Sequence, residues 1–211
     1  MDSRLFLPGW GAPAALYAPS LPSSWQALEP PSFAAAGGSF TAYRRWVDCE
    51  LRARGRSRLA GHSMGAALAI LAAADSPELV ERLVLIAPAG LPLEKPMRQS
   101  IRDFVRQLAH GAYPGFAARS GALAVARAPR AALAVARHVR GLDLRRECAR
   151  VRAAGIPATV VGCITDTLVT TDRARALADL LGAGYVELDL GGGHMWMLGE
   201  PARFAAVVAR G

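Results

Sequence analysis

The sequence predicts an α/β fold, in which a mostly parallel sheet of about six strands is flanked by helices and carries a helical cap insert. Three observations support this prediction. Apolar runs typical of strands alternate with segments of helical periodicity, as in parallel sheets covered on both faces. One such run ends at Ala60 and leads into a Gly-x-Ser-x-Gly pentapeptide and then an apolar helix. An arginine-rich segment, residues 97–150, interrupts the alternation.

Composition limits the class of protein. The chain has 211 residues, of which 52% are hydrophobic and 20% charged, which suits one domain with a sizeable core and excludes a disordered chain. We expect a single domain over residues 1–211, with its core in residues 1–96 and 151–211 and its cap in residues 97–150. No apolar run approaches the roughly 20 residues that cross a bilayer, so no transmembrane segment is expected.

The three cysteines, Cys49, Cys148 and Cys163, have neither an even number nor a CxxC spacing. This argues against a disulfide framework and a zinc site, and it favours small buried side chains in a reducing cytoplasm. We expect no metal, no organic cofactor and no nucleic-acid partner.

The N-terminal part of the chain begins with a short strand at residues 5–7, followed by a glycine loop. Residues 13–38 are rich in proline, alanine, glycine and serine, which favours loop, and only residues 25–28 resemble a strand. Over residues 39–54 apolar side chains recur at helical spacing until Gly55, a helix stop signal. We expect this helix to cover the sheet.

The later elements follow in alternation. Residues 57–60 and 82–90 are expected to be strands on either side of the pentapeptide and its helix. The insert is expected to hold three amphipathic helices, two of them separated by Pro129. The remaining elements are expected to be a strand at 158–164, a helix at 173–181, a strand at 185–190 and a last helix at 201–209.

The pentapeptide Gly61-His62-Ser63-Met64-Gly65 has a physical meaning in this context. A serine on a sharp turn from strand to helix adopts strained backbone angles, and glycines on both sides let the chain turn without clashes. The turn exposes the hydroxyl and directs N–H groups of the following helix toward the same point. Ser63 is therefore a candidate nucleophile.

Candidates for an acid and a base follow in the chain. Asp166 comes after the run 158–164, and His194 follows the run 185–190 through a glycine-rich corner. Serine, acid and histidine therefore occur in the chain order of one hydrolase fold. We predict Ser63 as nucleophile, His194 as base and Asp166 as the acid that orients it.

Two other acids compete with Asp166. Asp172 is expected to cap the helix that starts near residue 173. Asp189 lies within a strand and five residues before His194, whereas a triad acid approaches from a separate strand end. His62, beside the nucleophile, is expected to pack rather than to react.

With these residues in place, the sequence resembles the α/β-hydrolase family. The likeness rests on the pentapeptide, the strand after it, the acid loop 165–169 and the histidine loop 193–195. More narrowly, the chain is similar to the small bacterial carboxylesterases that include the pimeloyl-acyl-carrier-protein methyl ester esterases. The resemblance implies a serine esterase that forms an acyl-enzyme intermediate with a Ser-His-Asp triad. Relatives with an aspartate nucleophile are disfavoured by Ser63.

The resemblance also implies an oxyanion hole made by the backbone N–H groups of Met64 and Trp10. The family usually has a histidine where this chain has Pro8. Proline has no N–H, so we expect a loop of similar course with different internal hydrogen bonds; the alternative is an ordinary glycine turn with Trp10 in the core. The family's first β-hairpin is missing as well, which implies a shortened N-terminus and a smaller sheet.

The net charge is concentrated in the insert. Residues 97–150 contain eleven arginines and three acidic residues, an excess equal to the whole chain's formal charge of +8. We expect the basic cap to attract an acidic acyl carrier, either an acyl-carrier protein or coenzyme A, beside a small acyl ester substrate. A solvated helix face and anionic lipid are the alternatives.

Two functions from different classes fit the sequence. The first is a serine hydrolase acting on an ester or thioester. The second is a catalytically idle binding protein of the same fold, which the missing hairpin and Pro8 would suit. The complete set of Ser63, Asp166 and His194 favours the enzyme.

Overall fold

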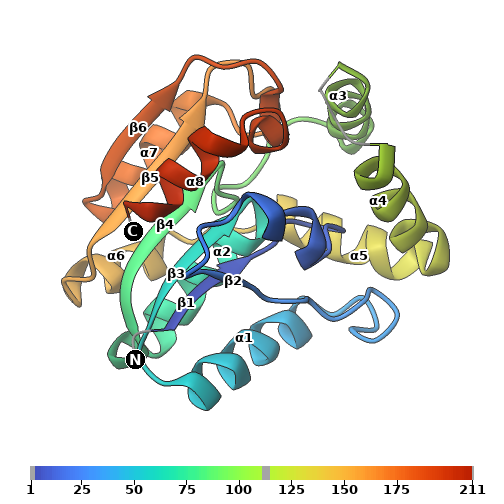
Figure 1. Cartoon of the computed structure of the whole chain (residues 1–211). Coiled ribbons are helices and arrows are strands. Elements are labelled where there is room, and N and C mark those ends of the chain that lie inside the picture. The colour runs from blue at the N-terminus through green and yellow to red at the C-terminus, as the bar shows by residue number, and fades with distance from the viewer. Residues whose placement is uncertain (1–2, 111–114, 211) are drawn as a thin grey trace.

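The computed structural model describes residues 3–110 and 115–210, and its centre is one parallel sheet (Figure 1). Six strands are joined in the order β2-β1-β3-β4-β5-β6, and every neighbouring pair is parallel. Their bounds are β1 Ser3–Leu7, β2 Gln26–Ala27, β3 Ser57–His62, β4 Val80–Ile86, β5 Ala158–Cys163 and β6 Gly184–Leu188. The predicted sheet of about six strands is confirmed.

The strands bury both faces, because successive side chains point to opposite sides of a sheet. In β1, Leu5 joins one hydrophobic cluster and Phe6 the other. In β4, Leu83 and Val84 divide in the same way. This double burial explains the apolar character of the central strands, whereas the edge strands β2 and β6 are partly exposed.

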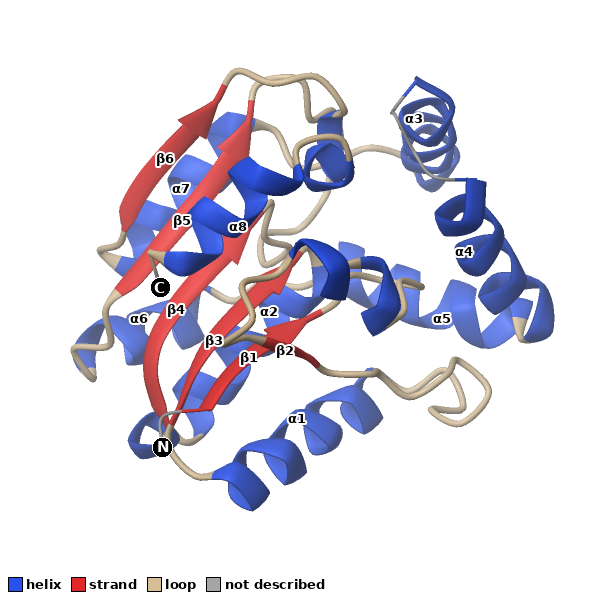
Figure 2. Ribbon diagram, viewed as in Figure 1, coloured by secondary structure: helices blue, strands red, loops and turns tan. Residues whose placement is uncertain are grey.

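Helices cover the two faces (Figure 2). One face is packed by α1 (Phe40–Arg54), α2 (Met64–Asp75), α6 (Arg145–Ala153) and α7 (Thr171–Leu181). The other face is packed by α8 (Pro201–Ala209), with short 3-10 turns at η1 (Ala14–Leu16), η2 (Ala18–Ser20) and η4 (Gly193–Leu198). A further turn, η3 (Pro77–Leu79), precedes β4. No helix in the described residues is long and apolar enough to cross a membrane.

Three helices of the insert lie beyond the carboxyl ends of the strands (Figures 1 and 2). They are α3 (Met97–His110), α4 (Gly115–Arg127) and α5 (Pro129–Arg140), and we call them the cap. Pro129 is the first residue of α5, as its fixed φ and missing N–H favour. The last helix of the insert, α6, packs instead against α7 and α2 of the core.

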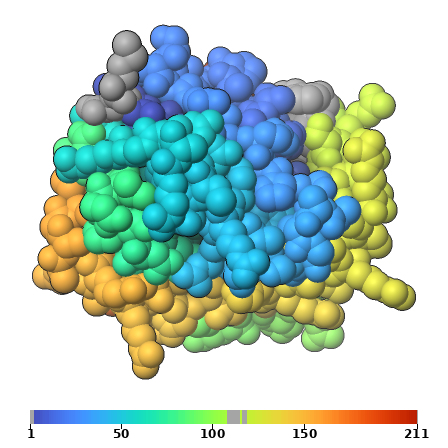
Figure 3. All heavy atoms as spheres, turned by 90° about the horizontal axis from the view of Figure 1, so that it is seen from below, coloured from blue at the N-terminus to red at the C-terminus, as the bar shows by residue number. Residues whose placement is uncertain are grey.

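The cap also meets the N-terminal half of the chain. Seen from below, the segment around α1 adjoins the yellow cap helices (Figure 3). Gly38 marks a close approach, since a Cβ there would lie 3.1 Å from the Cα of Ala131 in α5. The cap is therefore supported from beside the sheet as well as from the strand ends.

The element boundaries agree with the sequence pattern to within a few residues. The strand expected at 82–90 ends at Ile86, and the strand expected at 185–190 ends at Leu188, so Asp189 lies after the strand and not within it. The helix predicted from residue 39 begins at Phe40 and ends before Gly55, which has φ 75°. The helix predicted from residue 173 begins earlier, at Thr171, with Thr170 at the N-cap position. Asp172 therefore lies in the first turn, where its charge favours the helix dipole, and does not cap the helix.

Candidate active site

The turn between β3 and α2 places Ser63 in a strained conformation. Ser63 has φ 53° and ψ −112°, a left-handed backbone that side-chain-bearing residues rarely adopt. Its N–H donates to the carbonyl of Ile86 at the end of β4, 2.9 Å away. The strain is therefore held by the neighbouring strand.

The two glycines of the pentapeptide are required by close contacts. A Cβ at Gly61 would lie 2.5 Å from the backbone of Gly65. A Cβ at Gly65 would lie 2.0 Å from the carbonyl oxygen of Leu7. Because Gly61 has no side chain, the turn can close. Because Gly65 has none, α2 can pack against the end of β1.

Asp166 and His194 form a buried pair at the carboxyl ends of β5 and β6. His194 Nδ1 lies 2.8 Å from Asp166 Oδ2, and the two side chains are 6% and 0% exposed. The other carboxylate oxygen of Asp166 accepts the N–H groups of Leu168 and Val169 at 2.8 and 3.0 Å. These bonds fix the carboxylate so that one oxygen faces the imidazole.

The pair sets the tautomer of His194. A carboxylate accepts, so Nδ1 carries the proton and Nε2 keeps its lone pair.

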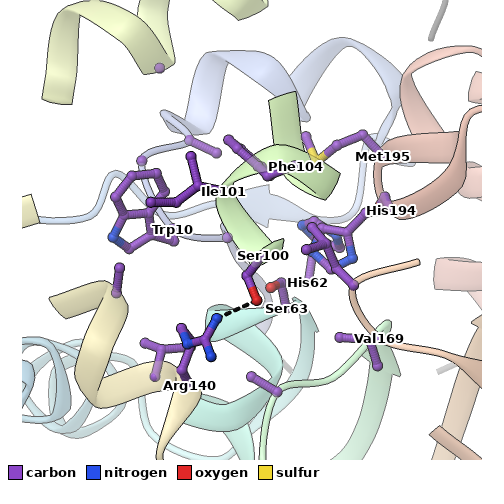
Figure 4. A pocket seen from close by; sticks show the side chains of 18 of the residues that line it. Trp10, His62, Ser63, Ser100, Ile101, Phe104, Arg140, Val169, His194 and Met195 are labelled. Carbon is purple, nitrogen blue, oxygen red and sulfur yellow. Dashed lines mark hydrogen bonds between the residues drawn. The ribbon is translucent and has the colours of Figure 1, made fainter. Parts of the chain in front are cut away.

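Ser63 and His194 both line one cavity (Figure 4). No hydrogen bond joins the Ser63 hydroxyl to His194 in the described part of the chain. Bonds of this kind often tighten only when a substrate is bound.

The rival acids lie elsewhere. Asp172 and Asp189 are both exposed, whereas Asp166 is 2% exposed and bonded to His194. Of the three predicted acids, the structure brings only Asp166 to the histidine.

Of the two candidate oxyanion donors, Met64 follows Ser63 in the chain and Trp10 lines the same cavity as Ser63. Met64 is the first residue of α2, so its N–H has no acceptor within the helix. Trp10 follows Gly9 in the loop after β1, and both line the cavity. Gly9 holds this loop, because its carbonyl accepts the N–H of Ala12 at 3.2 Å and its N–H donates to the Tyr17 hydroxyl at 3.4 Å. The loop is thus fixed without an N–H at Pro8.

The cavity has a volume of about 630 Å³ and mostly apolar walls. Core residues around Trp10 and Leu168 form one part of the wall, and α3, α4 and α5 of the cap form the rest. Figure 4 shows Trp10, Ile101 and Phe104 on one side of the cavity and Val169 and His194 on the other. This size suits a small organic ligand.

Two arginines at the cavity wall hold the linker between the core and the cap. Arg140 of α5 donates to the hydroxyl of Ser100 and the carbonyl of Lys95. Arg173 of α7 donates to the carbonyls of Leu91, at 2.6 Å, and Pro92. Burial lowers the pKa of Arg173 from its usual value. Neither guanidinium has a carboxylate partner within the described ranges.

Sequence reasoning missed two residues that contact the proposed base. Gln107 of α3 accepts the N–H of His194 at 2.5 Å and donates to the Thr167 hydroxyl at 2.5 Å. His62 lies 2.9 Å from the carbonyl of His194 and was expected only to pack. No sequence pattern pointed to Gln107, which is far from His194 in the chain. The position of His62 beside Ser63 could be noticed in the sequence, but the sequence did not show which group it contacts.

The part of the chain that the structure describes holds no group of three or more His, Cys, Asp or Glu side chains that could bind a metal ion. Cys49, Cys148 and Cys163 are free thiols; Cys148 and Cys163 are buried as expected, whereas Cys49 on α1 is exposed.

The comparisons with known proteins identify the family and the fold. A family model described as the alpha/beta hydrolase family matches residues 5–207, so the chain belongs to the alpha/beta hydrolase family. No curated protein matches the chain.

Solved structures of hydrolases are similar over nearly the whole chain. A hydrolase from Pseudomonas aeruginosa PA01 is 20% identical, with 99% of this chain and 89% of that chain covered and a TM-score of 0.72. The enol-lactonase from Burkholderia xenovorans LB400 is 18% identical, with 100% and 91% covered and a TM-score of 0.75. The esterase from Exiguobacterium antarcticum is 13% identical, with 99% and 91% covered and a TM-score of 0.76. At these identities the likeness establishes the fold.

Proposed function

We propose that the protein is a serine carboxylesterase, which cleaves a carboxylic ester or thioester through an acyl-enzyme intermediate. One observation carries this proposal. A buried Asp166–His194 pair at 2.8 Å shares a cavity with Ser63, which stands in a strained turn. A positioned base with an orienting acid beside a strained serine is the arrangement that nucleophilic acyl transfer needs.

In the first half-reaction, the Ser63 oxygen attacks the acyl carbon and its proton passes to Nε2 of His194. Asp166 stabilises the imidazolium through Nδ1–H without taking the proton. The N–H groups of Met64 and Trp10 donate to the oxyanion of the tetrahedral intermediate. The bond to the leaving oxygen or sulfur then breaks, and the leaving group takes the proton from His194.

In the second half-reaction, a water molecule attacks the acyl-enzyme. His194 accepts a proton from that water, and the acid product leaves as the Ser63 oxygen regains its proton. Every proton in this cycle moves between Ser63, His194, water and the leaving group.

The cavity favours an ester with an apolar acyl or alkyl part. Its walls are mostly aliphatic and aromatic, and Ile101 and Val105 line it while remaining 51% and 56% exposed. Exposed apolar side chains at a cavity wall suit the entry of an apolar substrate. Structures described as an esterase and an enol-lactonase share the fold, which supports the same class here. A methyl ester esterase of the pimeloyl type is one member of this class.

We include the acidic acyl carrier in the proposal. Eight of the eleven arginines of the insert lie on α3, α4 and α5, the helices around the cavity. Arg127, Arg130 and Arg137 are exposed and have no carboxylate partner among the described residues. An acyl-carrier protein or coenzyme A would bring negative charge to this surface. Three free thiols fit the cytoplasm as the proposed location.

Covalent labelling separates the enzyme from an idle binding protein. A fluorophosphonate probe should modify wild-type protein at Ser63, which peptide mass spectrometry can locate. Folded protein that stays unlabelled would favour the binding protein.

Substitutions test each proposed role. Ser63→Ala and His194→Ala should each lower kcat/KM for an activated ester on the order of 10⁴-fold or more, because members of a triad act as a unit. Asp166→Asn should cause a loss of similar order. Asp172→Asn and Asp189→Asn are matched controls that should keep normal activity. Near-normal turnover by a triad variant would refute the assignment.

A further inference from the structure

His62 is the pentapeptide residue that precedes the proposed nucleophile, and it is 1% exposed. Its Nε2 lies 2.9 Å from the carbonyl oxygen of His194. Its Nδ1 lies 2.9 Å from the hydroxyl of Tyr17. The two imidazole rings of His62 and His194 are 4.7 Å apart between centroids.

These contacts allow one arrangement of protons. A carbonyl oxygen only accepts, so Nε2 of His62 carries the proton and donates to His194. In a neutral ring Nδ1 then accepts, and the donor is the Tyr17 hydroxyl. The Tyr17 oxygen accepts the N–H of Gly9 at 3.4 Å. The hydrogen bonds therefore run from the oxyanion loop through Tyr17 and His62 to the backbone of His194.

The backbone at His194 needs such an external support. Three consecutive glycines, Gly191 to Gly193, precede it, and Gly192 and Gly193 have positive φ. Glycine loses more conformational freedom on folding than any other residue. After His194, Met195 departs from helical angles, with φ −115° and ψ 27°, so η4 does not hold the segment as a regular helix would. Side chains from other elements fix the histidine instead.

His62 binds His194 at a third point. Asp166 binds the ring, Gln107 binds the N–H, and His62 binds the carbonyl. The ring of His62 also packs closely against the oxyanion loop and requires glycine at position 9, because a Cβ on Gly9 would lie 2.8 Å from Nδ1. One side chain thus contacts both the base and the loop of the proposed oxyanion hole.

The charge of His62 also matters at this distance. Burial, and secondly the neighbouring His194, lowers the pKa of His62 well below its usual value. A neutral His62 does not repel the imidazolium that His194 becomes during acyl transfer. A cation 4.7 Å from that ring would oppose it.

We infer that His62 is a positioning residue, which holds His194 against Ser63 through the His194 carbonyl and links that carbonyl, by way of Tyr17, to the oxyanion loop. This inference rests on the proposed esterase function.

Two substitutions separate positioning from packing. In His62→Gln the side-chain amide reaches the place of Nε2 and still donates to the His194 carbonyl, but the hydrogen bond from the Tyr17 hydroxyl to Nδ1 is lost. In His62→Asn the amide oxygen takes the place of Nδ1 and still accepts from Tyr17, but the bond to His194 is lost. Each variant deletes one buried hydrogen bond, so both should lower Tm to a similar extent. His138→Asn, at an exposed histidine of α5, serves as the control.

The measurements are kcat and KM for an activated neutral ester, the rate of fluorophosphonate labelling of Ser63, and Tm. Positioning predicts that His62→Asn lowers kcat and the labelling rate by about 10- to 100-fold, with KM within about twofold of wild type. His62→Gln should keep kcat within about threefold. Equal kcat in the two variants, whether high or low, would overturn the inference, because a packing role predicts that both fall together with Tm.

Tyr17→Phe decides the matter if neither His62 variant folds. It keeps the ring that packs on Phe6, at 4.7 Å between centroids, and removes only the hydroxyl. The inference then predicts a loss of about three- to tenfold in kcat without a change in KM, and an unchanged kcat would overturn it. Wild type that neither labels at Ser63 nor hydrolyses any ester would instead refute the proposed function.

Discussion

At the scale of single residues, a buried neutral imidazole makes stability depend on pH. The folded-state pKa of His62 lies well below its usual value, chiefly through burial. The unfolded chain takes up a proton below about pH 6.5, while the folded chain does not. Stability should therefore fall as pH decreases through that value, and above it the contribution of His62 to stability should not vary with pH.

Thermal unfolding between about pH 8 and about pH 5 measures this effect. Wild type should lose Tm toward acid more steeply than His62→Gln, since the variant lacks the titrating group. His138→Asn, which alters an exposed histidine, should follow wild type. Parallel curves for wild type and His62→Gln would contradict the prediction. Tyr17 and His194 face the same ring, so the comparison must be made between variants.

At the scale of elements, helix α3 connects the cap to the two loops that carry the acid and the base. Gln107 binds the N–H of His194 and the hydroxyl of Thr167, one residue after Asp166. Lys95, just before α3, donates to the Thr167 carbonyl and pairs with Asp103 at 3.3 Å. The position of the cap and the geometry of the proposed triad are therefore coupled.

Gln107→Leu should lower kcat by about tenfold, because it removes both contacts while keeping the volume of the side chain. Gln107→Glu should restore most of the rate, since its carboxylate accepts from the His194 N–H and from the Thr167 hydroxyl. Equal rates in the two variants would show that the cap does not position the loops.

The sequence predicts elements better than their contacts. The helix over residues 39–54 was predictable because its apolar side chains recur at helical spacing. The two-residue strand β2 lies within residues 25–28, the one stretch of a proline- and glycine-rich segment that was expected to form a strand. Ser63 was predictable because the glycines beside it carry a local steric requirement. The bonds from Gln107 to His194 and from Trp10 to Ala132 join residues 87 and 122 positions apart, and no local pattern encodes them.

At the scale of the whole molecule, the excess of positive charge lies in residues 97–150, and the cap helices of this insert line the cavity. On α6 the charge is partly neutralised, since Arg150 pairs with Asp75 of α2 at 3.2 Å. Arg127, Arg130 and Arg137 on the cap have no such partner in the described ranges. A field of one sign at a cavity mouth steers ligands of opposite charge.

The salt dependence of kcat/KM should distinguish recruitment of an acidic acyl carrier from simple solvation of the cap arginines. As the Debye length shrinks from about 10 Å at 0.1 M to about 3 Å at 1 M salt, kcat/KM for a carrier-bound acyl ester should fall steeply. A neutral short ester should respond little. Changing Arg127, Arg130 and Arg137 together to glutamine should flatten the response for the carrier substrate. The same salt dependence for both substrates would show that these arginines form a solvated surface and do not recruit the carrier.

Trp10 gives the molecule a built-in optical signal. Its indole N–H donates to the Ala132 carbonyl of α5 at 3.1 Å, and its ring lies between Phe33 and Phe104, so its surroundings change whenever the cap moves or the cavity fills. Titrating Ser63→Ala protein with a neutral ester should shift the fluorescence emission to the blue as water leaves the indole. The same titration with Trp10→Phe added should give no shift, and an equal shift would assign the signal to another tryptophan. Ligand occupancy then becomes visible without turnover, from a chromophore that the chain already carries at the boundary between its core and its cap.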